Sequence, residues 1–136
     1  MFKRIDHVEI VTDQPEPTIR FYLDVLGFRL RSRDRVQPPG GTTTLNLAYL
    51  ELGGTTVELI TYEGAKVAPA PTGAHLGYNL MALEVDDMNA AIAYLKTKGV
   101  GVVWGPVVHE GRYARAEIAD PNGYHIELRQ WFGAPN

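Results

Sequence analysis

Three ionisable side chains lie inside runs of residues that are otherwise apolar and typical of strands. They are His7 near the start of the chain, Glu58 near its middle and Glu127 near its end. A carboxylate inside a protein is costly unless a metal ion or hydrogen-bond partners compensate for its lost hydration. One imidazole and two carboxylates form a donor set that suits Zn, Ni, Co, Mn or Fe(II). The residue types therefore predict a divalent-metal site, provided that folding brings the three side chains together.

An internal repeat predicts how these side chains are positioned. The run 5–12 aligns with the run 78–85, and Phe21 follows His7 at the same distance as Tyr94 follows Leu80. In this alignment Glu58 and Glu127 hold equivalent positions in the last strand of each half. Two halves related by a pseudo-twofold axis would direct both glutamates into one cavity.

Each half has the pattern of a βαβββ module. Apolar residues at helical spacing predict one helix in each half, which ends at Gly27 in the first half and at Gly99 in the second. Asp87 is the expected N-cap at the start of the second helix. The strands that follow are expected at 28–35, 45–52 and 56–62 in the first half, and at 101–108, 112–119 and 124–130 in the second.

We therefore expect an α+β fold in which two βαβββ modules pair into a curved mixed-sheet half-barrel with a cavity. The whole chain, 1–136, is expected to form one domain, with modules at 1–63 and 78–132. The segment 64–77 contains prolines and glycines and is predicted to be an extended linker.

The composition excludes several classes of protein. The chain has 136 residues, with 13 Lys and Arg against 16 Asp and Glu, a net charge of -3 and no cysteine. A basic field for nucleic acid is lacking, and thiolate metal sites and disulfides are impossible. No apolar run is long enough to cross a bilayer and the start lacks a secretory signal, so we expect a cytoplasmic protein that binds neither nucleic acid nor membrane.

Several strings resemble those of one known superfamily, and the resemblance covers nearly the whole chain. They are Asp6-His7-Val8, the run from Phe21 to Phe28, Leu50 to Gly54 before Val57-Glu58-Leu59, Leu83 to Asp87, and Asp120 to Gly123 before Ile126-Glu127-Leu128. With these strings the chain resembles the vicinal oxygen chelate superfamily. That superfamily includes glyoxalase I, methylmalonyl-CoA epimerase, extradiol dioxygenases, fosfomycin resistance enzymes and the metal-free bleomycin resistance proteins.

The resemblance implies metal ligands at His7, Glu58 and Glu127, and a fourth on the first strand of the second half. Leu80 stands at that fourth position, where metal-binding relatives usually have histidine, and leucine cannot ligate a metal. The nearest substitutes are His75 and, if the strand bulges, Asn79. Three protein ligands would still leave an open site of the kind that catalytic metals use.

The function expected from the resemblance is that of a divalent-metal-dependent lyase or isomerase of the glyoxalase type. The metal would chelate two vicinal oxygens of a small-molecule substrate and stabilise an enediolate, with Glu127 or Glu58 as the base. A homodimer is expected, because small chains of this fold usually complete the groove with a second copy.

Two alternatives stay open at this point. One is a metal-free small-molecule binding or antibiotic resistance protein, which Leu80 favours. The other is an Fe(II) extradiol dioxygenase, which would need His75 as a second histidine ligand.

Other charged residues have simpler interpretations. Glu58 or Glu127 could be a buried partner of arginine, and Glu9 could support His7 from the same strand face. Four arginines at alternate positions, 29, 31, 33 and 35, are expected to line one solvated strand face. Arg115 is a candidate for holding a substrate carboxylate.

Overall fold

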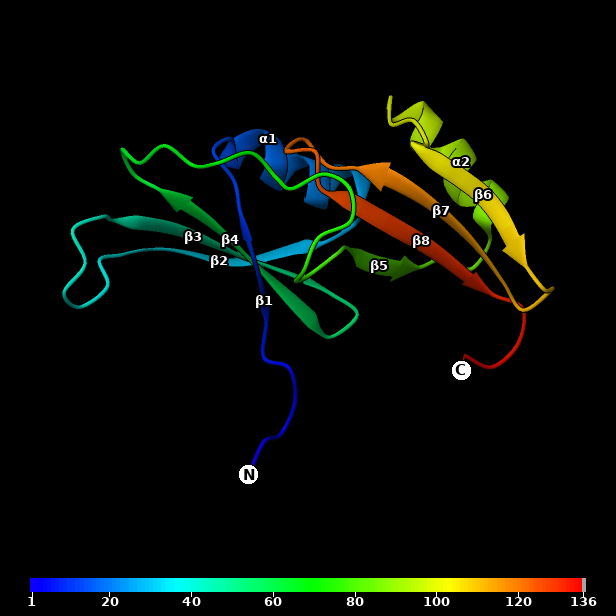
Figure 1. Cartoon of the computed structure of the whole chain (residues 1–136), viewed down its shortest axis with the longest axis horizontal. Helices are drawn as coiled ribbons and strands as arrows, with labels where there is room; N and C mark the ends of the chain where they lie inside the picture. The colour runs from blue at the N-terminus through cyan, green and yellow to red at the C-terminus, as the bar shows by residue number, and fades with distance from the viewer. Residues whose placement is uncertain (136) are drawn as a thin grey trace. The chain divides into compact units, whose positions relative to one another are not determined.

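The computed structural model describes residues 1–135, which divide into two compact units. The first unit is Met1–Pro69 and the second begins at Ala70. Each unit contains one βαβββ module, and Figure 1 shows the two modules in different colours because they follow one another along the chain. Between them, residues 63–80 contain no helix or strand.

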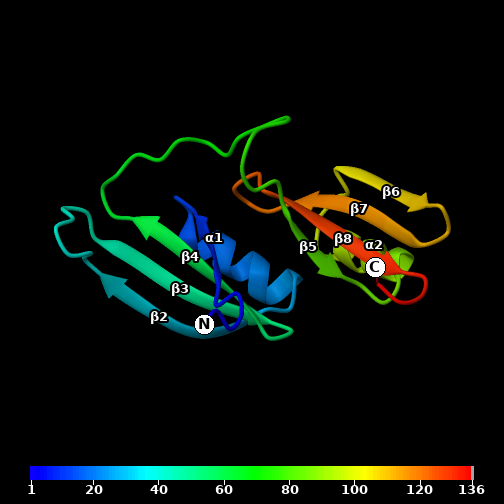
Figure 2. The ribbon, with the colours of Figure 1, turned by 60° about the horizontal axis from the view of Figure 1, so that its bottom comes forward.

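Unit 1 is a four-stranded mixed sheet with one helix. Its elements are β1 (Val8–Val11), α1 (Pro15–Arg20), η1 (Phe21–Val25), β2 (Arg29–Val36), β3 (Leu45–Leu52) and β4 (Thr55–Tyr62). The strand order is β1-β4-β3-β2, in which β1 runs parallel to β4 and the other neighbours are antiparallel. Figure 2 shows the sheet with the helix beside it.

Unit 2 repeats this arrangement. Its elements are β5 (Met81–Glu84), α2 (Met88–Thr97), β6 (Trp104–His109), β7 (Tyr113–Ala119) and β8 (His125–Trp131). The strand order is β5-β8-β7-β6, with β5 parallel to β8. The predicted α+β class and the repeated βαβββ modules are therefore confirmed. Each sheet is open, and neither closes on itself into a barrel.

The helix ends agree with the sequence signals, and one helix differs from the expectation. Gly27 and Gly99 adopt φ of 80° and 74°, the left-handed conformation that a glycine reaches at low cost. The Asp87 carboxylate accepts a hydrogen bond of 2.8 Å from the backbone N–H of Ala90, as expected of an N-cap. The second half of the first helix, η1, is a π-helical turn, in which the N–H of Leu26 donates to the carbonyl of Phe21. The spacing of apolar residues does not distinguish such a turn from an α-helical one.

The core of each unit lies on one face of its sheet. In β4, Val57 and Leu59 are buried, with exposed fractions of 0% and 2%. Neighbouring side chains along a strand point to opposite faces of the sheet. Glu58 therefore lies on the other face, where burial of a charged group requires a partner. In unit 2, Ile126 and Leu128 flank Glu127 in the same way.

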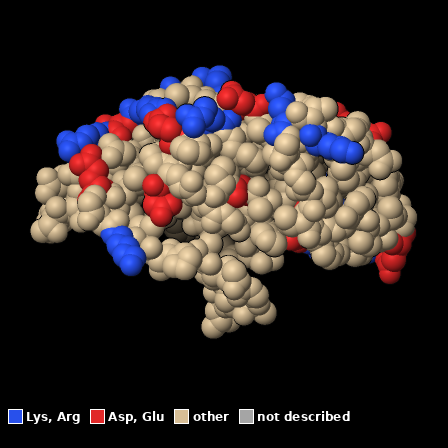
Figure 3. Space-filling model, turned by 90° about the horizontal axis from the view of Figure 1, so that it is seen from above, with Lys and Arg blue, Asp and Glu red and all other residues tan. Residues whose placement is uncertain are grey.

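Surface charges are interspersed. Figure 3 shows acidic and basic side chains mixed over the face that it presents. On β2, for example, Arg33 pairs with Glu16 and Arg35 with Glu63. Among residues 1–135 no helix is long and apolar enough to span a bilayer.

Candidate metal centre and the equivalent site of unit 2

Parallel pairing of β1 with β4 positions the first candidate site. Glu9 lies directly beside Glu58 in the register, and the ladder begins at Val8 opposite Val57. The first strand is therefore shorter than predicted, and His7 lies one residue before β1 rather than within it. In unit 2 the ladder begins at Met81. Leu80 thus occupies the position equivalent to His7, as the repeat alignment predicted.

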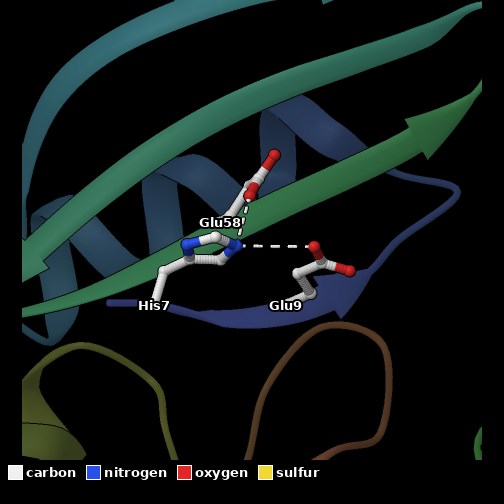
Figure 4. Close-up of side chains that lie close together, drawn as sticks. All are labelled: His7, Glu9 and Glu58. Carbon is white, nitrogen blue, oxygen red and sulfur yellow. Dashed lines mark hydrogen bonds and ion pairs between the residues drawn. The ribbon is translucent and has the colours of Figure 1, made fainter. Parts of the chain in front are cut away.

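His7 lies among three carboxylates. Its Nε2 atom is 3.0 Å from Oε2 of Glu58 and 3.4 Å from Oε1 of Glu9, and Figure 4 shows both glutamate carboxylates on the Nε2 side of the ring. The Nδ1 atom is 2.9 Å from Oδ2 of Asp6. The hydrogen bond to Asp6 is the main cause that raises the pKa of His7, with further contributions from Glu9 and Glu58. Because three carboxylates surround one imidazole, the cluster has an excess of negative charge, which favours a cation at its centre.

Glu58 is the most shielded member of the cluster. Its side chain is 8% exposed, against 31% for His7 and 59% for Glu9. Tyr49 on β3 lies opposite Glu58 in the register. Burial and the neighbouring Glu58 carboxylate raise the pKa of Tyr49, so the phenol stays protonated and can donate a hydrogen bond.

The donor set of this cluster fits a divalent metal. One ligand atom from each of His7, Glu9 and Glu58 lies within 4.8 Å of the others. Nitrogen and carboxylate oxygen suit Zn, Mn, Fe, Co or Ni, and a carboxylate behind the second ring nitrogen, here Asp6, commonly orients a metal-binding histidine. The structure thus brings together two of the predicted ligands, His7 and Glu58, and adds Glu9 as a third.

The equivalent glutamate of unit 2 has different neighbours. Oε1 of Glu127 accepts from Nε of Arg129 at 2.6 Å, and Nη2 of Arg129 lies 2.5 Å away. Nη2 of Arg115 lies 3.1 Å from Oε2 of Glu127. Glu127 is therefore the buried partner of two arginines, which is the simpler interpretation that the sequence left open.

His75 directs both ring nitrogens at backbone carbonyl groups. Nδ1 lies 2.8 Å from the oxygen of Gly73, and Nε2 lies 3.0 Å from that of Tyr78. Both ring nitrogens thus face backbone oxygens, and among the described residues His75 is not part of the group formed by His7, Glu9 and Glu58. His75, Asn79 and Leu80 instead help to line a cavity of about 240 Å³ in unit 2. The iron dioxygenase alternative stays a prediction, and it would require His75 to leave these two carbonyl groups.

The expected row of four arginines is split by a bulge. The register of β2 against β3 shifts between Leu30 and Ser32. Arg33 pairs with Glu16 of α1 and so lies on the helix side of the sheet. Arg31 stacks on the ring of Tyr49 at 5.1 Å, on the same side as Glu58. The prediction that the four share one face is therefore wrong, because an extra residue in a strand reverses the alternation beyond it.

Sequence reasoning gave too little weight to the nearest neighbours of the predicted ligands. It treated Glu9 only as a supporting residue and missed Arg129 and Asp6. The alternation of strand residues was a signal for two of them, because Glu9 stands two residues after His7 and Arg129 two residues after Glu127. Side chains at this spacing share a face.

Fold and site together define an α+β protein that has two βαβββ modules and an oxygen and nitrogen donor cluster on one of them. A family model described as Glyoxalase/Bleomycin resistance protein/Dioxygenase superfamily matches residues 4–128. The chain belongs to this superfamily.

Individual relatives agree in fold and differ in described role. A glyoxalase family protein of Bacillus cereus is 25% identical, with a TM-score of 0.83 and coverage of 98% of this chain and 97% of that one. A probable chloroplastic lactoylglutathione lyase of Arabidopsis thaliana is 32% identical over 93% of this chain, which spans 35% of that longer protein. An antibiotic binding protein of a Streptomyces species is 23% identical, with a TM-score of 0.67 over 96% of this chain and 97% of that one, and shares the fold alone.

Proposed function

We propose that this protein is a divalent-metal-dependent lyase or isomerase that acts on a small substrate with two vicinal oxygens. The observation that carries the proposal is the cluster of His7, Glu9 and Glu58 in one unit. Superfamily membership and the similarity to a probable lactoylglutathione lyase support it. A purely structural pairing of His7 with the buried Glu58 would not require two further carboxylates, Asp6 and Glu9, around the same imidazole.

In this proposal His7, Glu9 and Glu58 hold the cation, and Asp6 fixes the orientation of the His7 ring through Nδ1. A bound divalent cation would supply Lewis-acid polarisation of the substrate oxygens. Glu58 is also the base in this proposal, and because a carboxylate beside a dication has a lowered proton affinity, it would leave the cation as it accepts the proton from the carbon beside the carbonyl group. Tyr49, protonated and beside Glu58, is placed to donate a hydrogen bond to the carboxylate.

Glu127 enters this scheme only as a prediction. To act as a ligand or a base, it would first have to release Arg115 and Arg129. Hydrogen bonds between charged groups are the stronger ones in proteins, so this exchange opposes metal binding by Glu127.

The test measures metal content and activity together. The protein is purified without chelator, and bound metal per chain is determined for wild type and for the variants His7→Ala, Glu9→Gln and Glu127→Gln. We expect about one metal per chain in wild type and in Glu127→Gln, and strong loss in the other two variants. The interconversion of lactoylglutathione with its hemithioacetal should follow the metal content. Wild-type protein that takes up no added Zn, Mn, Co or Ni would contradict the proposal.

A second candidate is a metal-free protein that binds a small molecule. Two observations in unit 2 favour it: Leu80 replaces the expected histidine, and Glu127 is neutralised by arginines. This candidate predicts that metal-stripped protein binds its ligand as tightly as untreated protein. A chelator that abolishes ligand binding would exclude it.

A further inference from the structure

One face of the unit 2 sheet carries an ordered set of charged and aromatic side chains. Gln130 of β8 accepts a hydrogen bond from the backbone N–H of Met88 at the start of α2, so its side chain lies on the helix face of the sheet. Residues of β8 next to Gln130 in the sequence point to the opposite face. That face presents three rows of directly opposed residues: Tyr113 with Trp131, Arg115 with Arg129, and Glu117 with Glu127.

Like charges are opposed in two successive rows. Directly opposed residues of the same charge destabilise a sheet relative to opposed residues of opposite charge. Exchanging Arg129 with Glu127 would place each arginine opposite a glutamate. The observed order instead sets two guanidinium groups side by side, and fold stability alone does not explain this choice.

Aromatic rings fix the planes of both guanidinium groups. Arg129 lies over the rings of Tyr113 at 4.1 Å and Trp131 at 5.1 Å. Arg115 lies over the ring of Trp104 at 4.8 Å. The two arginine side chains are 24% and 27% exposed, so they are held in place yet reachable from solvent. Side chains stacked in this way lose little further entropy when they bind a ligand.

The ion pairs use only part of the donor capacity of the two arginines. Arg115 contacts both Glu117, at 2.7 Å, and Glu127, at 3.1 Å, through the single atom Nη2. Arg129 contacts Glu127 through Nε and Nη2. Among residues 1–135, Nε of Arg115 is buried without a hydrogen-bond partner. A guanidinium group has five N–H donors, and the two glutamates leave several of them unused.

We propose that this arginine strip, formed by Arg115, Arg129, Trp104, Tyr113 and Trp131, binds a small planar carboxylate. The carboxylate of the ligand accepts hydrogen bonds from the two adjacent guanidinium groups. The planar body of the ligand stacks on Trp104, which is 42% exposed and lies on the more open side of the strip. Glu117 and Glu127 hold the arginines in position. The strip belongs to unit 2 alone and needs no metal, so this proposal and the metal centre of unit 1 can fail independently.

The two tryptophans of the chain, Trp104 and Trp131, both belong to the strip, so they report on it directly. Benzoate is titrated into the full-length protein in the presence of EDTA, and binding is followed by tryptophan fluorescence and by the NMR signals of the indole N–H groups. Benzamide provides the same planar shape without the charge. We expect saturable binding of benzoate in the millimolar range or tighter, and at least about 10-fold weaker binding of benzamide.

Variants separate the strip from a general effect of positive charge. Arg115→Met and Arg129→Met should each weaken benzoate binding at least about 10-fold, and Arg115→Lys should fall between wild type and Arg115→Met, because a lysine keeps the charge and loses the planar fork. Arg33→Met is the matched control, since Arg33 is an ion-paired arginine of unit 1 whose partner is Glu16.

Circular dichroism and melting temperature verify that each variant is folded. If Arg115→Met does not fold, the comparison of Arg115→Lys with wild type and of benzoate with benzamide decides the matter. Equal affinity for benzoate and benzamide, unchanged affinity in Arg115→Lys, or no saturable response to benzoate up to about 20 mM would each overturn the proposal. None of these outcomes affects the metal content predicted for unit 1.

Discussion

Replacing Glu58 by glutamine separates its role as a metal ligand from its role in the fold. The substitution keeps the shape of the side chain and removes one negative charge from the cluster around His7. Without metal, His7 keeps Asp6 and Glu9 as neighbours. Because glutamine removes the buried charge itself and leaves His7 with two carboxylate neighbours, no buried charge loses its partner, and we expect the free energy of unfolding of the metal-free variant to stay within about 1 kcal/mol of wild type.

The effect on metal binding should be much larger. Two unit charges about 4 Å apart interact by about 4 kcal/mol at an effective dielectric constant of about 20, so loss of one carboxylate ligand should weaken metal binding about 1,000-fold. At a metal concentration about 100 times the wild-type Kd, binding stabilises wild type by about 2.7 kcal/mol. The same concentration would stabilise the variant by less than about 0.1 kcal/mol.

Thermal unfolding measures this difference. For a unit of this size, about 1 kcal/mol corresponds to a shift in Tm of about 4–8 °C. Added metal should thus raise the Tm of wild type by about 10–20 °C and that of Glu58→Gln by less than about 1 °C. Glu16→Gln is the control, because Glu16 is an ion-paired carboxylate of the same unit whose partner is Arg33, and it should show the full wild-type shift.

Two results would refute the reasoning. A full metal-induced shift in Glu58→Gln would show that Glu58 is not a ligand. A metal-free variant destabilised by about 3 kcal/mol or more, together with a wild type insensitive to metal, would show that Glu58 is a buried structural partner of His7.

Three further predictions concern stability and assembly. Asp87→Ala removes the cap on the N–H of Ala90 and should lower the free energy of unfolding by about 1 kcal/mol in denaturant titrations, whereas an unchanged midpoint would show that the cap contributes nothing. Hydrogen bonds from Arg35 and then Asn46 lower the pKa of Glu63 from 4.5 to about 2, so its contribution to stability is present above about pH 4.5 and is lost as the pH falls through about 2. The Tm difference between wild type and Glu63→Gln should accordingly vanish towards pH 2, and a constant difference at all pH values would contradict this assignment. Sedimentation velocity should show a homodimer, and monomer alone at micromolar concentrations would refute that expectation of the fold class.

Local signals in the sequence were enough to establish the repeated module. Alternating and helical spacing of apolar residues, the glycines at 27 and 99, and the Asp87 cap each depend on a few neighbouring residues, and the structure agrees with them. The repeat alignment predicted that Glu58 and Glu127 occupy equivalent positions inside the last strand of each half, and both are buried. The identity of the family followed from the same strings.

Only the tertiary structure decided what surrounds those two equivalent glutamates. Glu58 lies beside His7 and Glu9, whereas Glu127 lies between Arg115 and Arg129. Local sequence specifies the face of a strand on which a side chain lies, because the period of the strand is a property of its own backbone. Its neighbours come from other strands, and they depend on register and bulges, which are set by pairing between distant parts of the chain. Two positions that are equivalent in the repeat can therefore have opposite electrostatic surroundings.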